Sequence, residues 1–190
     1  MAFLSLVEIF DSVMMTAVVG YLFSDMFKRP YVEDYDPLKS FKYGIDMDNF
    51  KYAVMITAPA IILHELGHKF IALSYGLEAQ FQAAWMFLIL ALVMKLMNFG
   101  FIFIVPAYVA ISGHATPLQF GMTAFAGPAV NLALWLGAAF ALKKDLVSGK
   151  YNHILAVTSK INMFLFIFNM LPIPGFDGSK VFMGLIRAFF

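Results

Sequence analysis

The residues most suited to chemistry are His64, Glu65 and His68, which stand together in His64-Glu65-Leu66-Gly67-His68 within an apolar run. On an α-helix each residue advances about 100°, so the two histidines lie about 40° apart with Glu65 beside them. Two imidazoles one turn apart can bind one zinc ion, and the carboxylate between them can reach a water molecule on that ion. The spacing therefore predicts a zinc site that activates water, as in zinc hydrolases.

The setting of these three residues strengthens the prediction, because ionisable side chains within an apolar span are costly and usually functional. A structural alternative is that His64, Glu65 and His68 only hydrogen-bond to one another between packed helices. Packing alone gives no reason to place two histidines and a glutamate at metal-binding spacing. The pattern by itself is common, however, so the rest of the site must come from elsewhere in the chain.

A hydrolytic zinc takes three protein ligands and keeps one position for water. Because the chain has no cysteine, the third ligand must be a histidine or a carboxylate. The candidates near membrane depth are Asp11, Asp25, His114, His153 and Asp177. We expect the first two to be solvated carboxylates at the ends of an apolar run, and the two histidines to lie in or beside surface loops.

Asp177 differs because it follows a break in an apolar run, in Asn169-Met-Leu-Pro-Ile-Pro-Gly-Phe-Asp-Gly178. Because it contains two prolines, that segment cannot continue as a helix. Irregular backbone at membrane depth persists only where it is buried in protein or lines a wet cavity. The break therefore presents Asp177 to a site.

The composition indicates which elements position these residues. Of the 190 residues, 62% are hydrophobic and 13% are charged, against about 45–50% and about 25% in soluble domains. The excess of apolar side chains predicts an integral, multi-pass membrane protein of a cell membrane, folded as one domain over residues 1–190. A formal charge of +1 argues against nucleic acid as a partner.

A helical span needs about 20 mostly apolar residues. The runs that fit are about 7–27, 52–75, 119–142 and 153–171, with a polar solvent loop over 31–51 and a basic turn over 143–150. Residues 83–97 predict a shorter helix, and 179–190 a final piece too short to span. The fold class is thus all-α and polytopic, with about five to six transmembrane helices.

Residues 99–112 are rich in β-branched and aromatic side chains and are broken by Pro106. This composition favours an extended or re-entrant segment, that is, a short membrane-embedded β element. The sequence leaves open whether the whole stretch 83–112 crosses the membrane once or dips in and returns.

Three segments together resemble the site-2 protease family of intramembrane zinc metalloproteases: His-Glu-Leu-Gly-His at 64–68, Gly-Pro-Ala-Val-Asn at 127–131, and Asn-x-x-Pro-x-Pro-x-x-Asp-Gly at 169–178. The resemblance covers a catalytic core of about 52–185. It implies that His64, His68 and Asp177 ligate Zn²⁺ and that Glu65 is the general base and then the acid. It also implies that Asn169 holds the substrate carbonyl or its oxyanion, and that Asn131 is a helix-contact or substrate-side polar group.

The implied activity is hydrolysis of peptide bonds in transmembrane protein substrates, within or near the lipid bilayer. The family also places a sheet-like element before its Gly-Pro helix, and residues 99–112 are the counterpart that could pair with an unwound substrate. The apolar insert at 83–97 departs from the family pattern.

Two other functions remain. A membrane metal transporter would use the same ligands transiently, but it predicts further carboxylates or histidines along a pathway. A catalytically inactive binding scaffold would usually lack one of the site residues.

Orientation and oligomeric state stay open in the sequence. If 83–112 returns, the segments 28–51 and 143–150 share a side that holds eight Lys and Arg, which the positive-inside rule places in the cytoplasm. That would put the end of the 52–75 span outside, whereas the resembled family usually opens its site toward the cytosol.

Overall fold

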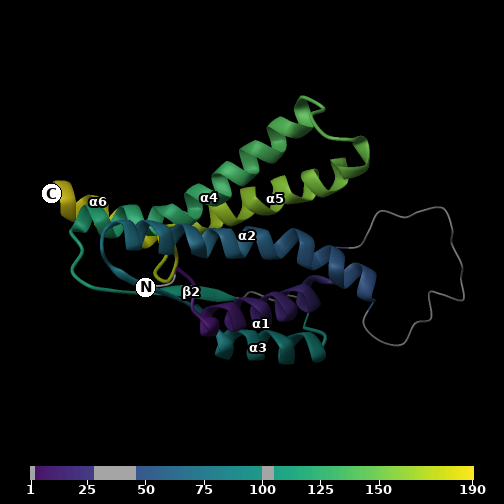
Figure 1. Ribbon diagram of the computed structural model, residues 1–190, viewed down its shortest axis with the longest axis horizontal. Helices are drawn as coiled ribbons and strands as arrows, with labels where there is room; N and C mark the ends of the chain where they lie inside the picture. Colours follow the sequence, from purple (N-terminus) through teal and green to yellow (C-terminus); the bar gives the residue numbers. More distant parts are fainter. Residues whose placement is uncertain (1–2, 28–45, 100–104) are drawn as a thin grey trace, which may run out of the picture.

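The computed structural model describes residues 3–27, 46–99 and 105–190. The helices are α1 (Leu6–Phe23), α2 (Met47–Ser74), α3 (Trp85–Leu96), α4 (Pro117–Lys143), α5 (Asn152–Asn169) and α6 (Asp177–Phe189), and the strands are β1 (Glu78–Ala83) and β2 (Ala107–Ser112) (Figure 1). A 3₁₀ turn, Gly149–Tyr151, precedes α5. Most of the predicted solvent loop and the start of the predicted β element lie outside the described residues.

Three of the described helices, α1, α2 and α4, are long and apolar enough to cross a membrane. The predicted count of five to six spans is not confirmed. Helix α3 has only 12 residues, and α5 carries Lys160 and Asn162 among its apolar side chains. The chain is therefore mostly helical with three candidate spans.

Helix α2 begins earlier than the sequence indicates. Asp46 is its N-cap and accepts hydrogen bonds from the backbone N–H groups of Asp48 and Asn49. Such a cap satisfies amides that a helix start leaves without partners. The prediction of a solvent loop as far as Lys51 is therefore wrong at its end, because Met47–Lys51 form the first turns of α2.

The two strands form an antiparallel pair in which Glu78 lies opposite Ser112 and Ala83 opposite Ala107. The predicted β element is confirmed over Ala107–Ser112, whereas its partner Glu78–Ala83 was not predicted. The pairing brings Glu78 and Ser112 side by side, so the stretch between them begins and ends near the same end of α2.

Helix α1 covers the edge of β1 that faces away from β2. The side chain of Glu8 accepts from the N–H of Phe81 at 2.7 Å, and that of Asp11 accepts from the N–H of Ala83 at 2.9 Å. The prediction that Asp11 is solvated is wrong, since the residue is 7% exposed. Buried backbone donors need acceptors, and this need explains the two buried carboxylates.

Glu8 also joins α1 to α2 through an ion pair with Lys69. The side chains of Glu8 and Lys69 are each 3% exposed. Lys69 directly follows His68. The same carboxylate thus binds the helix that carries the histidines and the strand that follows it. Around this junction Met15, Val19 and Phe81 form the centre of an apolar core.

Helices α4, α5 and α6 pack on the other side of α2 (Figure 1). Helices α4 and α6 touch through glycines, because a β-carbon on Gly184 would lie only 2.6 Å from Cα of Gly121. This close approach brings the start of α6, with Asp177, against α2 and α4.

Candidate metal centre

His64, His68 and Asp177 converge on one point between α2 and the start of α6. Their facing atoms form a triangle: Nε2 of His64 to Nε2 of His68 is 3.1 Å, and each nitrogen is 3.2 Å from Oδ2 of Asp177. The two histidines are 7% and 6% exposed, and the Asp177 side chain is 13% exposed. Among the described residues this is the one group of three such side chains able to hold a metal ion.

The triangle has the dimensions of a zinc site. Bonds of about 2.0–2.1 Å in a tetrahedral site separate neighbouring ligand atoms by about 3.3–3.4 Å, close to the separations found here. Helix α4 leaves space beside the two nitrogens, since a β-carbon on Gly127 would lie 2.6 Å from Nε2 of His64 and closer still to Nε2 of His68. Two imidazoles and one carboxylate are also the donor types that zinc prefers.

The sequence places Asp177 through a tight turn. Helix α5 ends at Asn169, and the segment with Pro172 and Pro174 leads directly into α6. A β-carbon on Gly178 would lie 2.6 Å from the carbonyl oxygen of Leu171. Glycine at 178 therefore lets the start of α6 fold back onto the end of α5, which brings Asp177 to the histidines.

Both imidazoles are oriented from behind. Nδ1 of His68 donates to the backbone carbonyl of Thr123 at 2.8 Å, and Nδ1 of His64 lies 2.5 Å from Oδ1 of Asn131. When Nδ1 carries the proton, a neutral imidazole offers the lone pair of Nε2 to a metal. Both Nε2 atoms accordingly point into the triangle.

Asp177 has a second neighbour that sequence reasoning missed. Nζ of Lys180 lies 3.8 Å from Oδ1 of Asp177, the oxygen that does not face the histidines. Burial alone would raise the pKa of the Asp177 carboxyl, but the hydrogen bonds with His64 and His68 outweigh burial and hold that pKa below its ordinary value. The spacing of three residues on one helix was the available signal for Lys180.

The two predicted catalytic residues lie at the same centre or at the turn beside it. Glu65 is 8% exposed and directly follows His64 on α2. Asn169 is the last residue of α5 and is half-buried; its side chain forms no hydrogen bond with the described part of the chain. Their roles as general base and oxyanion partner stay predictions.

Asn131 is fully buried, at 0% exposed, and its amide bonds His64, Ala60 and Asn162. The position fits the helix-contact alternative, and a substrate contact for Asn131 stays a prediction.

The other candidate ligands lie away from the triangle. Asp25 pairs with Lys95 at 3.0 Å, and His153 bonds the hydroxyl of Tyr52. His114 is exposed in the segment between β2 and α4. Within the described residues none of these three, nor Asp11, belongs to the metal-binding group.

The chain is similar in sequence to several known proteins. A protein of Methanocaldococcus jannaschii named "Putative zinc metalloprotease MJ0611" is 39% identical over 134 residues, which cover 70% of this chain and 69% of that protein. Two longer proteins also match: sll0528 of Synechocystis (29% identical over 127 residues) and Rip3 of Mycobacterium tuberculosis (28% over 143 residues), both with the same descriptive name.

The matched regions cover 67% and 72% of this chain but only 29% and 30% of those two longer relatives. No family model matches the chain, and no solved structure does. The match to the Methanocaldococcus protein is both long and similar, and His64, His68 and Asp177 form a group that could hold a metal ion. The chain therefore belongs to this family of zinc metalloproteases.

Proposed function

We propose that the protein is an intramembrane zinc metalloprotease of the site-2 protease type, which hydrolyses peptide bonds of transmembrane protein substrates in a cell membrane. The observation that carries the proposal is the position of the metal centre. Two of its ligands and Glu65 lie on α2, which is long and apolar enough to cross a membrane. A water-activating site on such a helix acts on substrates at membrane depth.

Zinc bound at this centre would lower the pKa of a water molecule to about 7 and polarise the substrate carbonyl. Glu65 takes the proton of that water as the oxygen attacks the carbonyl carbon. The same carboxyl then delivers the proton to the departing amide nitrogen as the C–N bond breaks, so one peptide bond and one water give an acid and an amine. The side-chain amide of Asn169 donates to the carbonyl oxygen as negative charge develops on it.

A transmembrane substrate must unwind before cleavage, since a helix keeps its peptide bonds in hydrogen bonds. The sheet offers replacement partners by strand addition. The outer edge of β1 is occupied by Glu8 and Asp11. Because Phe81 directs its N–H to Glu8, its partner Val109 directs its own N–H away from β1, and no acceptor for it occurs in the described residues. We therefore assign the substrate to the free edge of β2.

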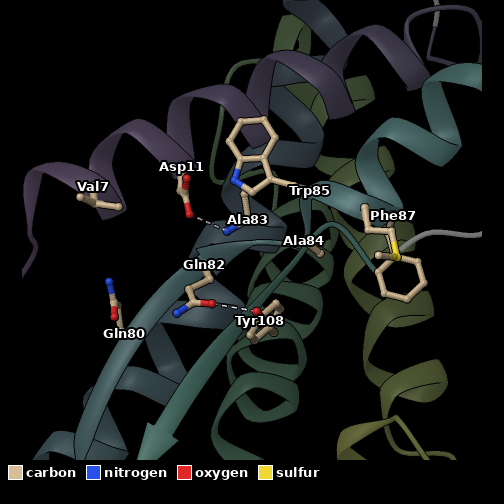
Figure 2. A pocket seen from close by; sticks show the side chains of 10 residues that line it. Val7, Asp11, Gln80, Gln82, Ala83, Ala84, Trp85, Phe87 and Tyr108 are labelled. Atoms are coloured by element: carbon tan, nitrogen blue, oxygen red, sulfur yellow. Dashed lines mark hydrogen bonds between the residues drawn. The ribbon is translucent and has the colours of Figure 1, made fainter.

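A hollow lies beside the sheet, lined by residues of α1, β1 and the start of α3 and by Tyr108 of β2 (Figure 2). It has a volume of about 490 Å³, and its polar lining comes from Asp11, Gln80, Gln82 and Tyr108. The hydroxyl of Tyr108 donates to Oε1 of Gln82 at 2.7 Å across the two strands. In a chain this apolar, such a hollow gives an unwound peptide polar groups and room for water.

The test is cleavage of a model single-span substrate by the purified protein in vesicles. Glu65→Gln is expected to lower the cleavage rate by about 10²-fold or more while the protein keeps its zinc. Asp145→Asn, in the exposed turn after α4, is the matched control and is expected to cleave normally. Normal cleavage by Glu65→Gln would overturn the assigned base. Cleavage of soluble peptides but of no membrane-inserted substrate would overturn the intramembrane assignment.

A further inference from the structure

Two fully buried asparagines connect the metal centre to a helix that provides no ligand. Asn131 of α4 and Asn162 of α5 are each 0% exposed. The two side-chain amides bond each other, Nδ2 of Asn131 to Oδ1 of Asn162 at 2.9 Å, and Asn131 contacts His64. The reaction described above uses neither residue. Burying two amides among apolar helices is costly unless their groups are paired.

The direction of this chain of hydrogen bonds is fixed at its far end. The carbonyl of Thr158 can only accept, so Asn162 must turn its NH₂ group to it, at 2.8 Å. The oxygen of Asn162 then faces Asn131 and receives one N–H of that amide. The second N–H of Asn131 donates to the carbonyl of Ala60 at 3.1 Å.

With both of its N–H groups used, Asn131 can present only its oxygen to His64, at 2.5 Å from Nδ1. The imidazole must therefore donate from Nδ1, which leaves the lone pair on Nε2 for the metal. The other histidine has no such dependence, because the acceptor for His68 is the backbone carbonyl of Thr123. The position of that backbone carbonyl does not depend on which side chain residue 123 carries.

We propose that Asn162 is a positioning residue of the zinc centre, which acts through Asn131 to fix the tautomer and ring orientation of His64. Helix α5 thereby takes part in metal binding without a ligand of its own. Removing the oxygen of Asn162 would leave one N–H of Asn131 buried and unpaired. The amide could find another acceptor only by rotating, and rotation would move its oxygen away from Nδ1 of His64.

A role in helix packing alone predicts a different result, so metal affinity is the property to measure. The dissociation constant for zinc is obtained by chelator competition on the purified protein, and the visible spectrum of the Co²⁺-loaded protein reports the ligand geometry. Asn162→Leu is expected to weaken zinc binding about tenfold and Asn131→Leu about a hundredfold, as for other residues that support metal ligands, with altered Co²⁺ spectra. Wild-type affinity and spectrum in Asn162→Leu would overturn the proposal.

Two further variants separate positioning from folding. Asn162→Asp in its neutral form keeps an oxygen that accepts from Asn131 and an O–H for the carbonyl of Thr158, and is expected to bind zinc within about threefold of wild type; affinity as poor as that of Asn162→Leu would overturn the proposal. Ser159→Ala removes a hydrogen bond from α5 to the carbonyl of Trp135 on α4. Because this hydrogen bond is not connected to His64, the zinc affinity of the variant is expected to be unchanged. An equal loss in Ser159→Ala would show that helix packing alone sets the affinity.

This proposal rests on zinc binding and not on the class of substrate. Failure to cleave a transmembrane substrate would overturn the proposed function and leave the positioning role of Asn162 intact. Unchanged zinc affinity in Asn162→Leu would overturn the positioning role and leave the proposed function intact.

Discussion

Gly127 of α4 lies directly against His68 of α2, so close that a β-carbon at position 127 would overlap Nε2 of the imidazole. The same β-carbon would lie 2.6 Å from Nε2 of His64. Gly127 thus keeps open the side of the triangle that faces α4. Its role follows from the space beside the histidines and not from backbone conformation.

Gly127→Ala is therefore expected to weaken zinc binding about tenfold or more, because the added methyl displaces both ligand nitrogens. Zinc content after purification and chelator competition measure the effect. Gly137→Ala on the same helix is the control, since a β-carbon there meets no atom within 4 Å. Full zinc content in Gly127→Ala would contradict the geometry.

Removal of zinc is expected to destabilise the folded protein, because an ion held by His64, His68 and Asp177 would link α2 to α6. A ligand present at 100 times its dissociation constant stabilises the native state by about 2.7 kcal/mol. Thermal unfolding in detergent, with chelator and after zinc is restored, measures this shift. Asp177→Asn is expected to show little or no zinc-dependent shift; a shift as large as that of wild type would exclude Asp177 as a ligand.

The buried pair of Glu8 and Lys69 gives a stability prediction. Lys69→Met removes one charge and leaves the other in an apolar interior, which is expected to cost about 3–5 kcal/mol. The double variant Glu8→Gln/Lys69→Met is expected to regain much of that loss, because no unpaired charge remains. Equilibrium unfolding measures both, with Lys144→Met in the exposed turn after α4 as control. Wild-type stability in Lys69→Met would contradict the pairing.

Strand addition at β2 predicts a specific effect of proline. The N–H of Val109 points away from β1 and takes no part in the pairing of the two strands. Val109→Pro can therefore keep that pairing while it removes one hydrogen-bond donor from the free edge of β2. One hydrogen bond has a net value of about 1 kcal/mol, so kcat/KM for a membrane-inserted substrate is expected to fall about fivefold. Val109→Ala is the control, and equal activity of the proline and alanine variants would place the substrate elsewhere.

The convergence of His64, His68 and Asp177 was predictable from the sequence because local patterns of residues indicate it. One helical turn separates His64 from His68, and the prolines before Asp177 indicate a break in a helix. The positions of the helices were predictable for the same reason. Long apolar runs bounded by prolines and charged residues can be recognised without information on tertiary contacts. The start of α2 was placed too late because Asp46, its cap, stands in a polar segment that resembles a loop.

The rest depended on contacts between elements far apart in the chain. Strand β1 was missed because its six residues mix alanine with glutamine and have no β-branched side chain. Asp11 looked like a solvated residue near a helix end, and only the position of Ala83 explains its burial. The link from Asn162 to His64 joins three helices, and no spacing within a single segment encodes it.

The hydrogen bonds from β1 to Glu8 and Asp11 also bear on the order of assembly. A strand that enters an apolar environment alone carries unpaired donors on both edges. Because α1 precedes β1 in the chain, both carboxylates have been synthesised before the strand emerges, whereas β2 follows only after α3. Strand β1 can therefore pair one of its edges with α1 before β2 has been synthesised.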